Sequence, residues 1–470
     1  NLNLVFPEIF LSLSIMFLLV LGVFKKKSSK LIFNFSLLII LITSILTINE
    51  TFLIERETLF SGGIVIDQMS SLMKIITLLG GFLVLTISTN YLKNFKIYNI
   101  EYPILILSSI LGMMIMISSN DLIVFYMGLE LQSLALYVLA TYNRDQLKSS
   151  EAGLKYFVLS ALSSGLLLYG CSLIYGFSGS TNFDEISTKL SYDEYVLTFG
   201  IVFILVGLAF KISAVPFHMW APDVYEGSPT TVTLFFTMVP KIAALTVFIR
   251  FLYVPFLNLI DQWQMIIVFL SIASMIFGAV AAIGQTNIKR LIAYSSISHI
   301  GYTLAGLATA SNEGIQSSII YFSIYIVMNL ALFSCLLMLK RKDQYYEGID
   351  DLSGLSKNHP LLSLCLLLIL FSLAGIPPLA GFFAKFYVFK AVLEQSMYFL
   401  AIVGLLSTVV AAFYYLRIIK IIYFDKEKEK YDTDHSLWLK FSLTASTILI
   451  LFYFIFPSQL IEVISRINII

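Results

Sequence analysis

Long apolar runs separated by short polar segments are the main pattern of this 470-residue chain. A helix needs about 20 mostly apolar residues to cross the hydrocarbon core of a membrane. Runs of this kind predict fourteen membrane-spanning helices, at residues 4–24, 31–49, 69–91, 102–119, 122–142, 153–178, 197–220, 229–250, 264–286, 291–310, 315–339, 361–393, 397–419 and 439–460. The predicted fold class is therefore all-α, a polytopic membrane protein. The first run carries Pro7 and Glu8 and lacks a small-residue cleavage site, so it is interpreted as a helix and not as a signal peptide.

The charges between the predicted helices alternate in sign along the chain. With the N-terminus placed outside, lysine and arginine gather in the inside loops, within residues 25–30, 93–96, 144–148, 289–290, 340–357 and 420–430. Acidic residues dominate the outside loops, within residues 50–57 and 184–194 and at Asp261, Glu313 and Glu394. The exceptions are Arg56, Lys189 and Arg250. Because cytoplasmic loops are enriched in lysine and arginine, both termini are predicted to face the outside.

The composition agrees with a membrane protein and narrows the possible chemistry. Hydrophobic residues make up 58% of the chain and charged residues 13%, whereas soluble domains carry about 25% charged residues. The net charge of +1 gives no reason to expect a nucleic acid partner. Cys171, Cys335 and Cys365 lie in apolar runs without a CxxC spacing, and no glycine-rich nucleotide fingerprint is present. We therefore expect neither a metal nor a cofactor in this chain, and any redox chemistry in another chain.

Glu130 is a carboxylate inside the predicted helix 122–142. Tyr126 precedes it by four residues, and Ser133 and Tyr137 follow at three and seven, so they form one polar stripe with Glu130 on an apolar helix. An ionisable residue within a membrane span is expensive and usually functional. The alternative is a structural carboxylate capped by the neighbouring hydroxyls.

Two lysines lie in the predicted spans that follow. Lys211 comes just before Pro216 and Pro222, which are expected to break its helix and admit polar groups at that depth. The alternative for Lys211 is that its ammonium group extends to the inner surface. Lys241 lies too deep in its helix to reach either surface, and Thr237 precedes it by one turn. The alternative for Lys241 is a buried structural ion pair.

Lys385 and His299 complete the set of ionisable residues near the middle of a span. Lys385 follows Pro377 and Pro378, a second predicted helix break. His299 shares a helix face with Ser295, Ser296 and Tyr302, and hydrogen-bonded packing is its alternative interpretation. Each central charge costs about 2.5–3.5 kcal/mol on insertion scales. We therefore interpret Glu130, Lys211, Lys241, Lys385 and His299 as candidate proton-transfer residues rather than as structural ones.

Five stretches of the sequence resemble one known family. They are GLELQSLALYVLA, EAGLKYFVLSALSSG, FKISAVPFHMWAPDVYEGSPT, KRLIAYSSISHIGY and GIPPLAGFFAKFYVF, spread from about residue 120 to 390. They are similar to the antiporter-like subunits of respiratory complex I, the proton-pumping NADH:quinone oxidoreductase. Lysine at position 385, the absence of a long lateral helix after the last span and the HMWAPDVYEGSPT segment favour the branch called subunit N.

The resemblance implies roles for individual residues. Glu130 and Lys211 would form the input pair, Lys241 the relay and Lys385 the outlet. Glu151 and Lys155 match a second, more peripheral pair of the family. Tyr126, Ser133 and Thr237 would support the site, and the prolines at 216, 222, 377 and 378 would break the helices.

The same two breaks predict the domain organisation. They fall in the seventh and twelfth helices, an odd number of helices apart, as two inverted five-helix repeats require. The expected segments are an N-terminal part at residues 1–100, two half-channel repeats at residues 101–255 and 256–425, and a C-terminal helix at residues 426–470.

The function expected from the resemblance is proton translocation as a subunit of NADH:ubiquinone oxidoreductase. FMN, iron–sulfur clusters and quinone are then expected in partner subunits. The partners would be other membrane-arm subunits, above all the neighbouring antiporter-like subunit and the small membrane subunits toward the quinone site.

The alternative function is a subunit of a multisubunit sodium/proton antiporter, whereas an ordinary solute carrier would need a pocket of convergent polar groups. The expected location is the mitochondrial inner membrane, with the bacterial plasma membrane as the alternative.

We predict that Glu130, Lys211, Lys241, His299 and Lys385 lie at one depth, near the middle of the membrane. Each lies near the middle of its span, in five different predicted helices, so the row would carry charge along the membrane plane. An experimental structure of the assembled protein tests this by projecting the five side-chain tips onto the membrane normal. A spread of about 20 Å or more, which is two-thirds of the hydrocarbon core, would instead indicate a channel across the membrane.

Overall fold

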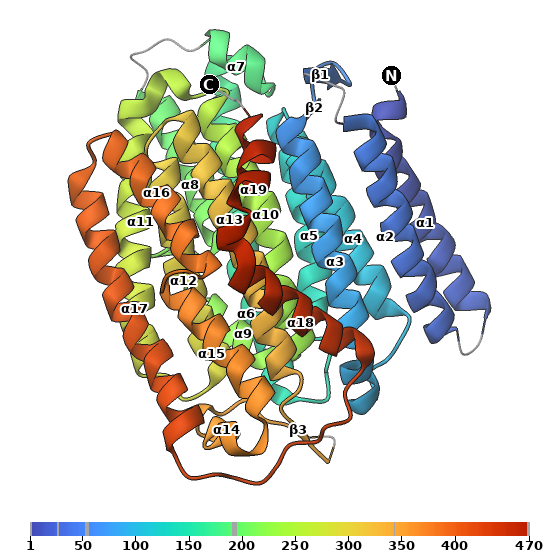
Figure 1. The fold of residues 1–470 in the computed structure, drawn as a ribbon. Helices are drawn as coiled ribbons and strands as arrows, with labels where there is room; N and C mark the ends of the chain where they lie inside the picture. Colours follow the sequence, from blue (N-terminus) through green and yellow to red (C-terminus); the bar gives the residue numbers. More distant parts are fainter. Residues whose placement is uncertain (1, 26–27, 52–55, 190–194, 343, 468–470) are drawn as a thin grey trace. The chain divides into compact units, whose positions relative to one another are not determined.

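The structure is a computed structural model that describes residues 2–25, 28–51, 56–189, 195–342 and 344–467 (Figure 1). Ten helices of this described part are long and apolar enough to cross a membrane. They include α1 (Phe6–Phe24), α2 (Ser29–Thr51), α3 (Gln68–Asn94), α5 (Leu122–Ala140), α6 (Leu147–Ser178), α10 (Thr230–Tyr253), α11 (Ile260–Ile283), α13 (Asn312–Leu336) and α17 (Tyr398–Phe424). The tenth combines α18 (Leu437–Phe452) with the 3-10 helix η4 (Tyr453–Ile455).

The remaining predicted spans correspond to shorter or more polar helices. These are α4 (Glu101–Ile117), α8 (Tyr195–Ile212), α12 (Ile288–Leu307), α15 (Pro360–Ala374) and α16 (Ala380–Glu394). Each of the fourteen predicted runs therefore coincides with one helix or with one interrupted pair. The prediction of an all-α polytopic membrane fold is confirmed.

Both predicted helix breaks are present. In the first, α8 ends at Ile212, Ser213 adopts a positive φ of 64°, and the short helix α9 (Ala221–Gly227) follows. In the second, α15 ends at Ala374, Gly375 adopts a left-handed φ of 88°, and α16 starts at Ala380 (Figure 1). Proline cannot continue the backbone ladder, which explains why each break coincides with its prolines.

Some short elements were not predicted from the apolar pattern. They are the helices α7 (Phe183–Lys189), α14 (Leu355–Asn358) and α19 (Pro457–Ser465), the 3-10 helices η1 (Leu2–Val5), η2 (Leu257–Leu259) and η3 (Ile349–Leu352), and the strands β1 (Arg56–Leu59), β2 (Ile64–Asp67), β3 (Lys340–Arg341) and β4 (Gln344–Tyr345). The strands form two antiparallel hairpins, β1 with β2 and β3 with β4. All are too short or too polar to give a membrane-span signal.

The chain forms two compact units. The first unit comprises Asn1–Ile212 and Gly227–Trp263, and the second comprises Ser213–Glu226 and Gln264–Asn468. The predicted four segments and the inverted relation of the two repeats stay predictions.

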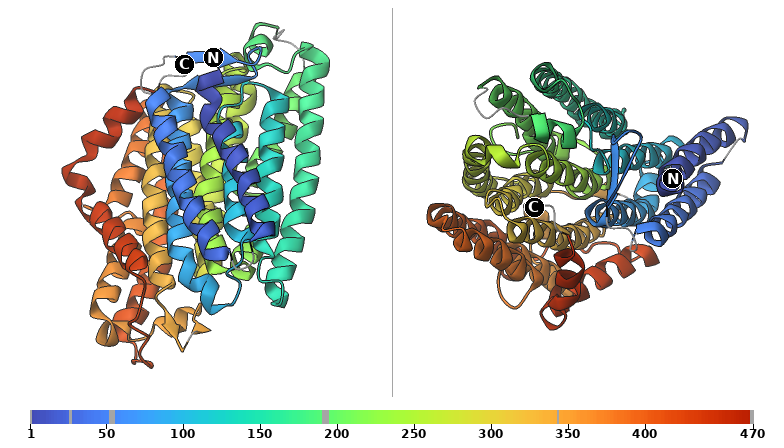
Figure 2. Two further views of the ribbon diagram at one scale, coloured as in Figure 1. Left: turned by 90° about the vertical axis from the view of Figure 1, so that its right-hand side faces the viewer. Right: turned by 90° about the horizontal axis from the view of Figure 1, so that it is seen from above.

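In the first unit, α10 is the central helix. All 24 of its residues are buried, and it contacts α3, α4, α5 and α8. The other helices pair around it, α4 with α5, α6 with α8, and α2 with both α1 and α3; these helices run side by side in Figure 2. Glycines allow two of these pairs to approach closely: a Cβ at Gly112 would lie 2.5 Å from the backbone nitrogen of Gln132, and one at Gly170 would lie 2.7 Å from the carbonyl oxygen of Gly200. Small residues at such crossings are typical of membrane helices, whose association depends on backbone proximity.

In the second unit, α13 is the central helix. It contacts α12, α15, α16 and α18. The unit also includes α9, which the arginine of α12 holds by two ion pairs. The guanidinium group of Arg290 lies 2.6 Å from Asp223 and 3.1 Å from Glu226.

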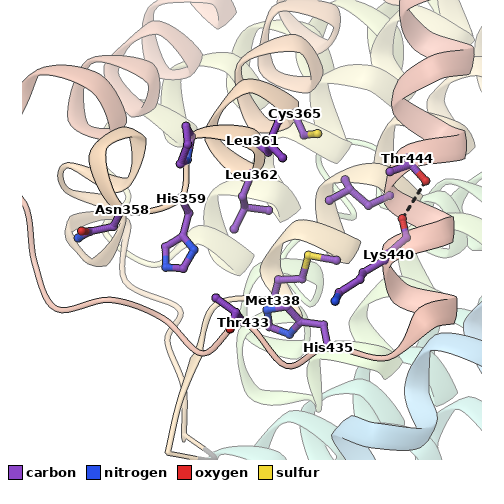
Figure 3. A pocket seen from close by; sticks show the side chains of 12 residues that line it. Met338, Asn358, His359, Leu361, Leu362, Cys365, Thr433, His435, Lys440 and Thr444 are labelled. Carbon is purple, nitrogen blue, oxygen red and sulfur yellow. Dashed lines mark hydrogen bonds between the residues drawn. The ribbon is translucent and has the colours of Figure 1, made fainter.

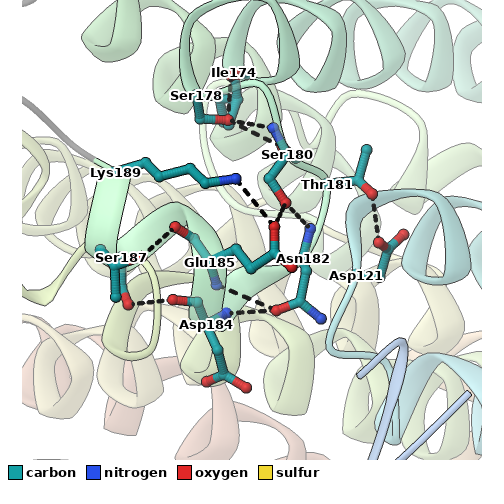
Figure 4. A network of polar contacts seen from close by, with 11 residues as sticks. Asp121, Ile174, Ser178, Ser180, Thr181, Asn182, Asp184, Glu185, Ser187 and Lys189 are labelled. Atoms are coloured by element: carbon teal, nitrogen blue, oxygen red, sulfur yellow. Dashed lines mark hydrogen bonds and ion pairs between the residues drawn. The ribbon is translucent and has the colours of Figure 1, made fainter. Parts of the chain in front are cut away.

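At one end of the first unit, hydrogen bonds join three loops, and Figure 4 shows one of these bonds, between Thr181 and Asp121. Asn120 donates from its side chain to the carbonyl oxygen of Gly62 and to Asp184, and Asn182 also donates to Gly62. Thr181 donates to Asp121, which in turn caps the start of α5. All three loops were predicted to lie outside, so their meeting at one end agrees with the predicted alternation of the helices.

The same end of the unit contains a largely buried ion pair between Asp67, the N-cap residue of α3, and Arg250 of α10, whose side chains are 16% and 4% exposed. Arg250 donates two hydrogen bonds to the carboxylate of Asp67, at 2.9 and 3.1 Å, and Asp67 also accepts from the backbone of Ser70. Burial raises the pKa of Asp67, but the charge and hydrogen bonds of Arg250 and the hydrogen bonds of Ser70 outweigh it, so the pKa lies below its ordinary value. The ion pair therefore fixes the start of α3 against the end of α10.

We predict that Arg250→Leu lowers the free energy of unfolding by about 3–5 kcal/mol, because it leaves a buried carboxylate without its counter-charge. The double variant Asp67→Asn/Arg250→Leu is expected to recover part of that loss. Since the folded pKa of Asp67 is lowered, its stabilising contribution is complete above its unfolded pKa of about 3.9 and is lost as the pH falls through the folded pKa. Thermal unfolding of the purified proteins between pH 3 and pH 7, with Lys189→Arg as a surface control, checks both points; equal stabilities at pH 7 would contradict them.

Candidate functional site

The first unit holds the ammonium group of Lys211 where three helices meet. Lys211 is in the last turn of α8 and is 7% exposed. Its Nζ donates to the hydroxyl of Ser133 in α5 and to the hydroxyl of Ser160 in α6, both at 2.7 Å. It also lies 5.9 Å from the ring centre of Tyr137, whose own hydroxyl donates to Ser160 at 2.6 Å. These inward contacts argue against an ammonium group that extends to the inner surface.

Glu130 lies one turn before Ser133 on α5, but the structure gives it a different environment from that of Lys211. It is only partly buried, and its Oε1 atom accepts no hydrogen bond. Neither a hydrogen bond nor an ion pair joins the described side chains of Glu130 and Lys211. Ser133 links the two residues: it lies on the same helix stripe as Glu130, and its hydroxyl accepts a hydrogen bond from Lys211. Tyr126, the other predicted member of the stripe, is also partly exposed.

Lys241 occupies the middle of the central helix α10 and is 1% exposed. Pro240 precedes it within the helix. The hydroxyls of Thr233 and Thr237 donate to carbonyl oxygens of the same segment, those of Pro229 and Leu234. Both threonines are buried, and each hydroxyl donates to a backbone carbonyl oxygen.

Glu151 and Lys155 form an ion pair on α6, apart from the buried residues. Their charged atoms are 2.7 Å apart, and the side chains are 55% and 41% exposed. The neighbouring side chains of Leu154, Phe157 and Val158 are exposed too. The pair thus lies on an exposed surface of the first unit.

In the second unit, the break between α15 and α16 holds the ammonium group of Lys385. Lys385 is 6% exposed, and its Nζ donates to the carbonyl oxygens of Ala374 at 3.0 Å and Leu373 at 3.3 Å. The last carbonyls of a helix lack partners within the helix and carry partial negative charge. The break therefore supplies the acceptors for the lysine. Nζ also lies 5.0 Å from the ring centre of Tyr302.

His299 lies among tyrosines in the same unit. Its Nδ1 is 2.6 Å from the hydroxyl of Tyr321, and its Nε2 is 3.3 Å from that of Tyr415. The hydroxyl of Tyr415 is also 2.5 Å from Ser295. The ring of Tyr302 meets that of His299 edge-on at 6.0 Å. Tyr302 thus contacts both His299 and Lys385.

A cavity of about 420 Å³ lies elsewhere in the second unit, between α15 and α18 (Figure 3). Leu361, Leu362, Cys365 and Leu443 supply much of its wall, and His359, His435 and Lys440 lie at its polar side. None of the buried lysines lines it. No group of three metal-binding side chains occurs among the residues that the structure describes.

Residues 119–411 match the family described as "NADH:quinone oxidoreductase/Mrp antiporter, TM". The chain belongs to this family. It is 77% identical to NADH-quinone oxidoreductase subunit N of Pelagibacter ubique over the full length of both chains. It is 50% identical to the protein of the same name from Rhodospirillum rubrum, over 97% of this chain and 94% of that one. The sequence resemblance to the complex I subunits is thereby confirmed.

Solved structures of related proteins have the same fold. A chain of respiratory complex I from Thermus thermophilus superposes with a TM-score of 0.85 at 28% identity, covering 98% of this chain and 100% of that one. A chain of the Mrp complex from Dietzia sp. also gives a TM-score of 0.85, over 99% of this chain and 97% of that one, but at 21% identity this likeness concerns the fold alone.

Several partners of the buried lysines and of His299 could not be predicted from the sequence. Ser160, Tyr321 and Tyr415 reach Lys211 and His299 from other helices, and hydroxyl residues are common along all of these helices. The carbonyl acceptors of Lys385 are backbone atoms, so no side-chain pattern reveals them. In the sequence, only Pro377 and Pro378 indicated this site, because they predict the helix break that supplies the carbonyl oxygens.

We predict that the double variant Ser133→Ala/Ser160→Ala destabilises the protein through Lys211. Each hydrogen bond to a charged group contributes about 1.5–3 kcal/mol, so a loss of about 3 kcal/mol or more in unfolding free energy is expected. Adding Lys211→Met removes the charge and is expected to restore most of the lost unfolding free energy. Ser163→Ala is the matched control, since Ser163 is on the same helix and its buried hydroxyl has no partner. Equal effects with and without Lys211→Met in thermal unfolding would contradict the assignment.

Proposed function

We propose that this chain is the N-type, proton-translocating subunit in the membrane arm of an NADH–quinone oxidoreductase. The observation that carries the proposal is the way two buried lysines are held. Lys211 donates to two hydroxyls, and Lys385 donates to two backbone carbonyls. The 77% identical relative bears the name of subunit N, and family membership supports the same assignment.

Neutral acceptors leave a lysine able to release its proton. A lysine in a close ion pair loses the attraction of its carboxylate if its proton goes to a third group, whereas hydroxyl and carbonyl acceptors carry no net charge. Its protonation then depends on burial and on charges that arrive nearby. A unit charge about 5 Å away contributes about 3 kcal/mol at an effective dielectric constant of 20. That is comparable to the work of moving one proton against about 150 mV.

The roles of the individual residues follow the family pattern. Glu130 and Lys211 act as the input pair, and Ser133, one turn after Glu130 on α5, accepts a hydrogen bond from Lys211. Lys241 acts as the relay, and Lys385 as the outlet beside the second break. His299 takes part through the hydroxyls of the tyrosines around it.

Electron transfer takes place in partner subunits. These subunits would bind FMN, iron–sulfur clusters and quinone, and the partners in the membrane would be the neighbouring antiporter-like and small membrane subunits. The relatives named above are bacterial, which favours the bacterial plasma membrane over the mitochondrial inner membrane. The antiporter subunit is the second candidate function, but its support is similarity of fold at 21% identity.

The test is to purify the tagged chain from its own membranes and to measure the complex it belongs to. We expect flavin and iron–sulfur centres to co-purify and NADH oxidation to drive proton translocation into vesicles. In the same preparation, Glu130→Gln is expected to assemble normally and to reduce proton translocation about tenfold or more, as removal of a proton-transfer group typically does.

Two results would refute the proposal. One is co-purification with small antiporter subunits and without redox centres. The other is full proton translocation by a correctly assembled Glu130→Gln complex.

A further inference from the structure

A second buried acid–base pair, which the sequence pattern did not single out, lies among the N-terminal helices of the first unit. The ammonium nitrogen of Lys74 in α3 lies 2.5 Å from the Oε1 atom of Glu8 in α1. The two side chains are 5% and 8% exposed. The other carboxylate oxygen, Oε2 of Glu8, is buried and has no hydrogen-bond partner. A buried carboxylate oxygen without a donor is a place where a proton or a water molecule can bind.

The depth of this pair along the unit follows from the contacts of α3 with α10. Asp67, at the start of α3, pairs with Arg250. A Cβ at Gly80, farther along α3, would lie 2.9 Å from the side chain of Val239. The two helices are therefore antiparallel, and Lys241 is level with Thr77 to within one residue. Lys74 lies about 4.5 Å from that level, on the side that leads to the Asp67–Arg250 end.

The polar residues of α3 cluster along this segment. Ser70, Ser71, Lys74 and Thr77 are all at least 95% buried within three turns of the helix. They occupy the stretch between the capped end of α3 and the level of Lys241. A lysine and its carboxylate thus lie between the end of the unit and the proposed relay residue.

The two ion pairs of this region differ in whether their side chains can exchange a proton. Arginine side chains are not deprotonated in proteins. Both oxygens of Asp67 accept hydrogen bonds from Arg250, so that pair has a structural role. Lysine and glutamate can both change protonation. Their proton can pass from Nζ to the carboxylate, breaking an N–H bond and forming an O–H bond, which converts the ion pair into a neutral amine and a carboxylic acid. A low-dielectric interior favours the neutral pair more than water does.

We propose that Glu8 and Lys74 form a further proton-binding pair of the transport pathway, between Lys241 and the Asp67–Arg250 end of the first unit. This inference rests on the proposed function. It adds two residues from α1 and α3, a part of the chain outside the region that matches the family. A buried pair that served only to attach α1 would be replaceable by arginine and glutamate, whereas a proton-exchanging pair would not.

The decisive variant is therefore Lys74→Arg, which keeps the positive charge and the ion pair but removes the exchangeable proton. It is to be studied in the intact oxidoreductase in membrane vesicles, with proton translocation and NADH oxidation measured together. We expect an assembled complex in which proton translocation falls about tenfold or more, as for loss of a positioned proton-transfer group. Lys189→Arg is the matched control, because Lys189 forms an exposed ion pair with Glu185 and is expected to retain the wild-type rate.

The double variant Glu8→Gln/Lys74→Met covers the case in which Lys74→Arg does not assemble. It removes both charges, so an attachment role predicts an assembled and active complex, while a proton-binding role predicts an assembled complex with the same loss of translocation. Wild-type translocation in either variant would overturn the inference.

The variant Lys241→Met distinguishes this inference from the proposed function. If Lys241→Met abolishes proton translocation while Lys74→Arg does not, only the inference about Glu8 and Lys74 fails.

Discussion

Inside a bilayer a polar group has no water to bind, so it must find its partner within the protein. The buried hydroxyls of this chain mostly satisfy this constraint by donating to a carbonyl one turn back in the same helix, as Thr77 and Thr246 do. The indole nitrogen of Trp263 donates to the carbonyl oxygen of Phe256 for the same reason. The buried charged groups Arg250, Lys211 and Lys385 instead find their partners on other helices or at helix ends. Each of them therefore brings particular helices or helix ends together.

The charges meet this requirement in two physically different ways. Arginines are matched with carboxylates: Arg250 with Asp67 in the first unit, and Arg290 with Asp223 and Glu226 in the second. Guanidinium groups stay protonated, so these pairs hold helix ends in place. The lysines Lys211 and Lys385 are instead held by hydroxyl and carbonyl oxygens. Such contacts stabilise an ammonium group without committing it to a carboxylate, which suits a group that has to gain and lose a proton.

The two helix breaks interrupt the backbone hydrogen bonds of a span and thereby supply backbone atoms to polar contacts. A break frees backbone carbonyls that must be satisfied, and at the end of α15 Lys385 satisfies them. At the other break the backbone nitrogen of Val215 donates to Ser274 of α11, within the second unit. The proline-containing segments that interrupt the apolar pattern are thus the places where the backbone itself becomes part of a polar site.

The sequence by itself determined the fold class, the approximate bounds of the fourteen spans and the positions of both breaks. It could do so because lipid imposes a minimum apolar length and because proline cannot continue a helix. It also singled out Glu130, Lys211, Lys241 and Lys385, since a charge in an apolar run is rare. The partners were decided only by the tertiary structure: Ser160 for Lys211, the carbonyls of Leu373 and Ala374 for Lys385, and Tyr321 and Tyr415 for His299. Glu8 and Lys74 were passed over because each is near the end of its span, where a charge can usually reach water. Whether it does so depends on the neighbouring helices, and packing among helices far apart in the chain leaves no local pattern in the sequence.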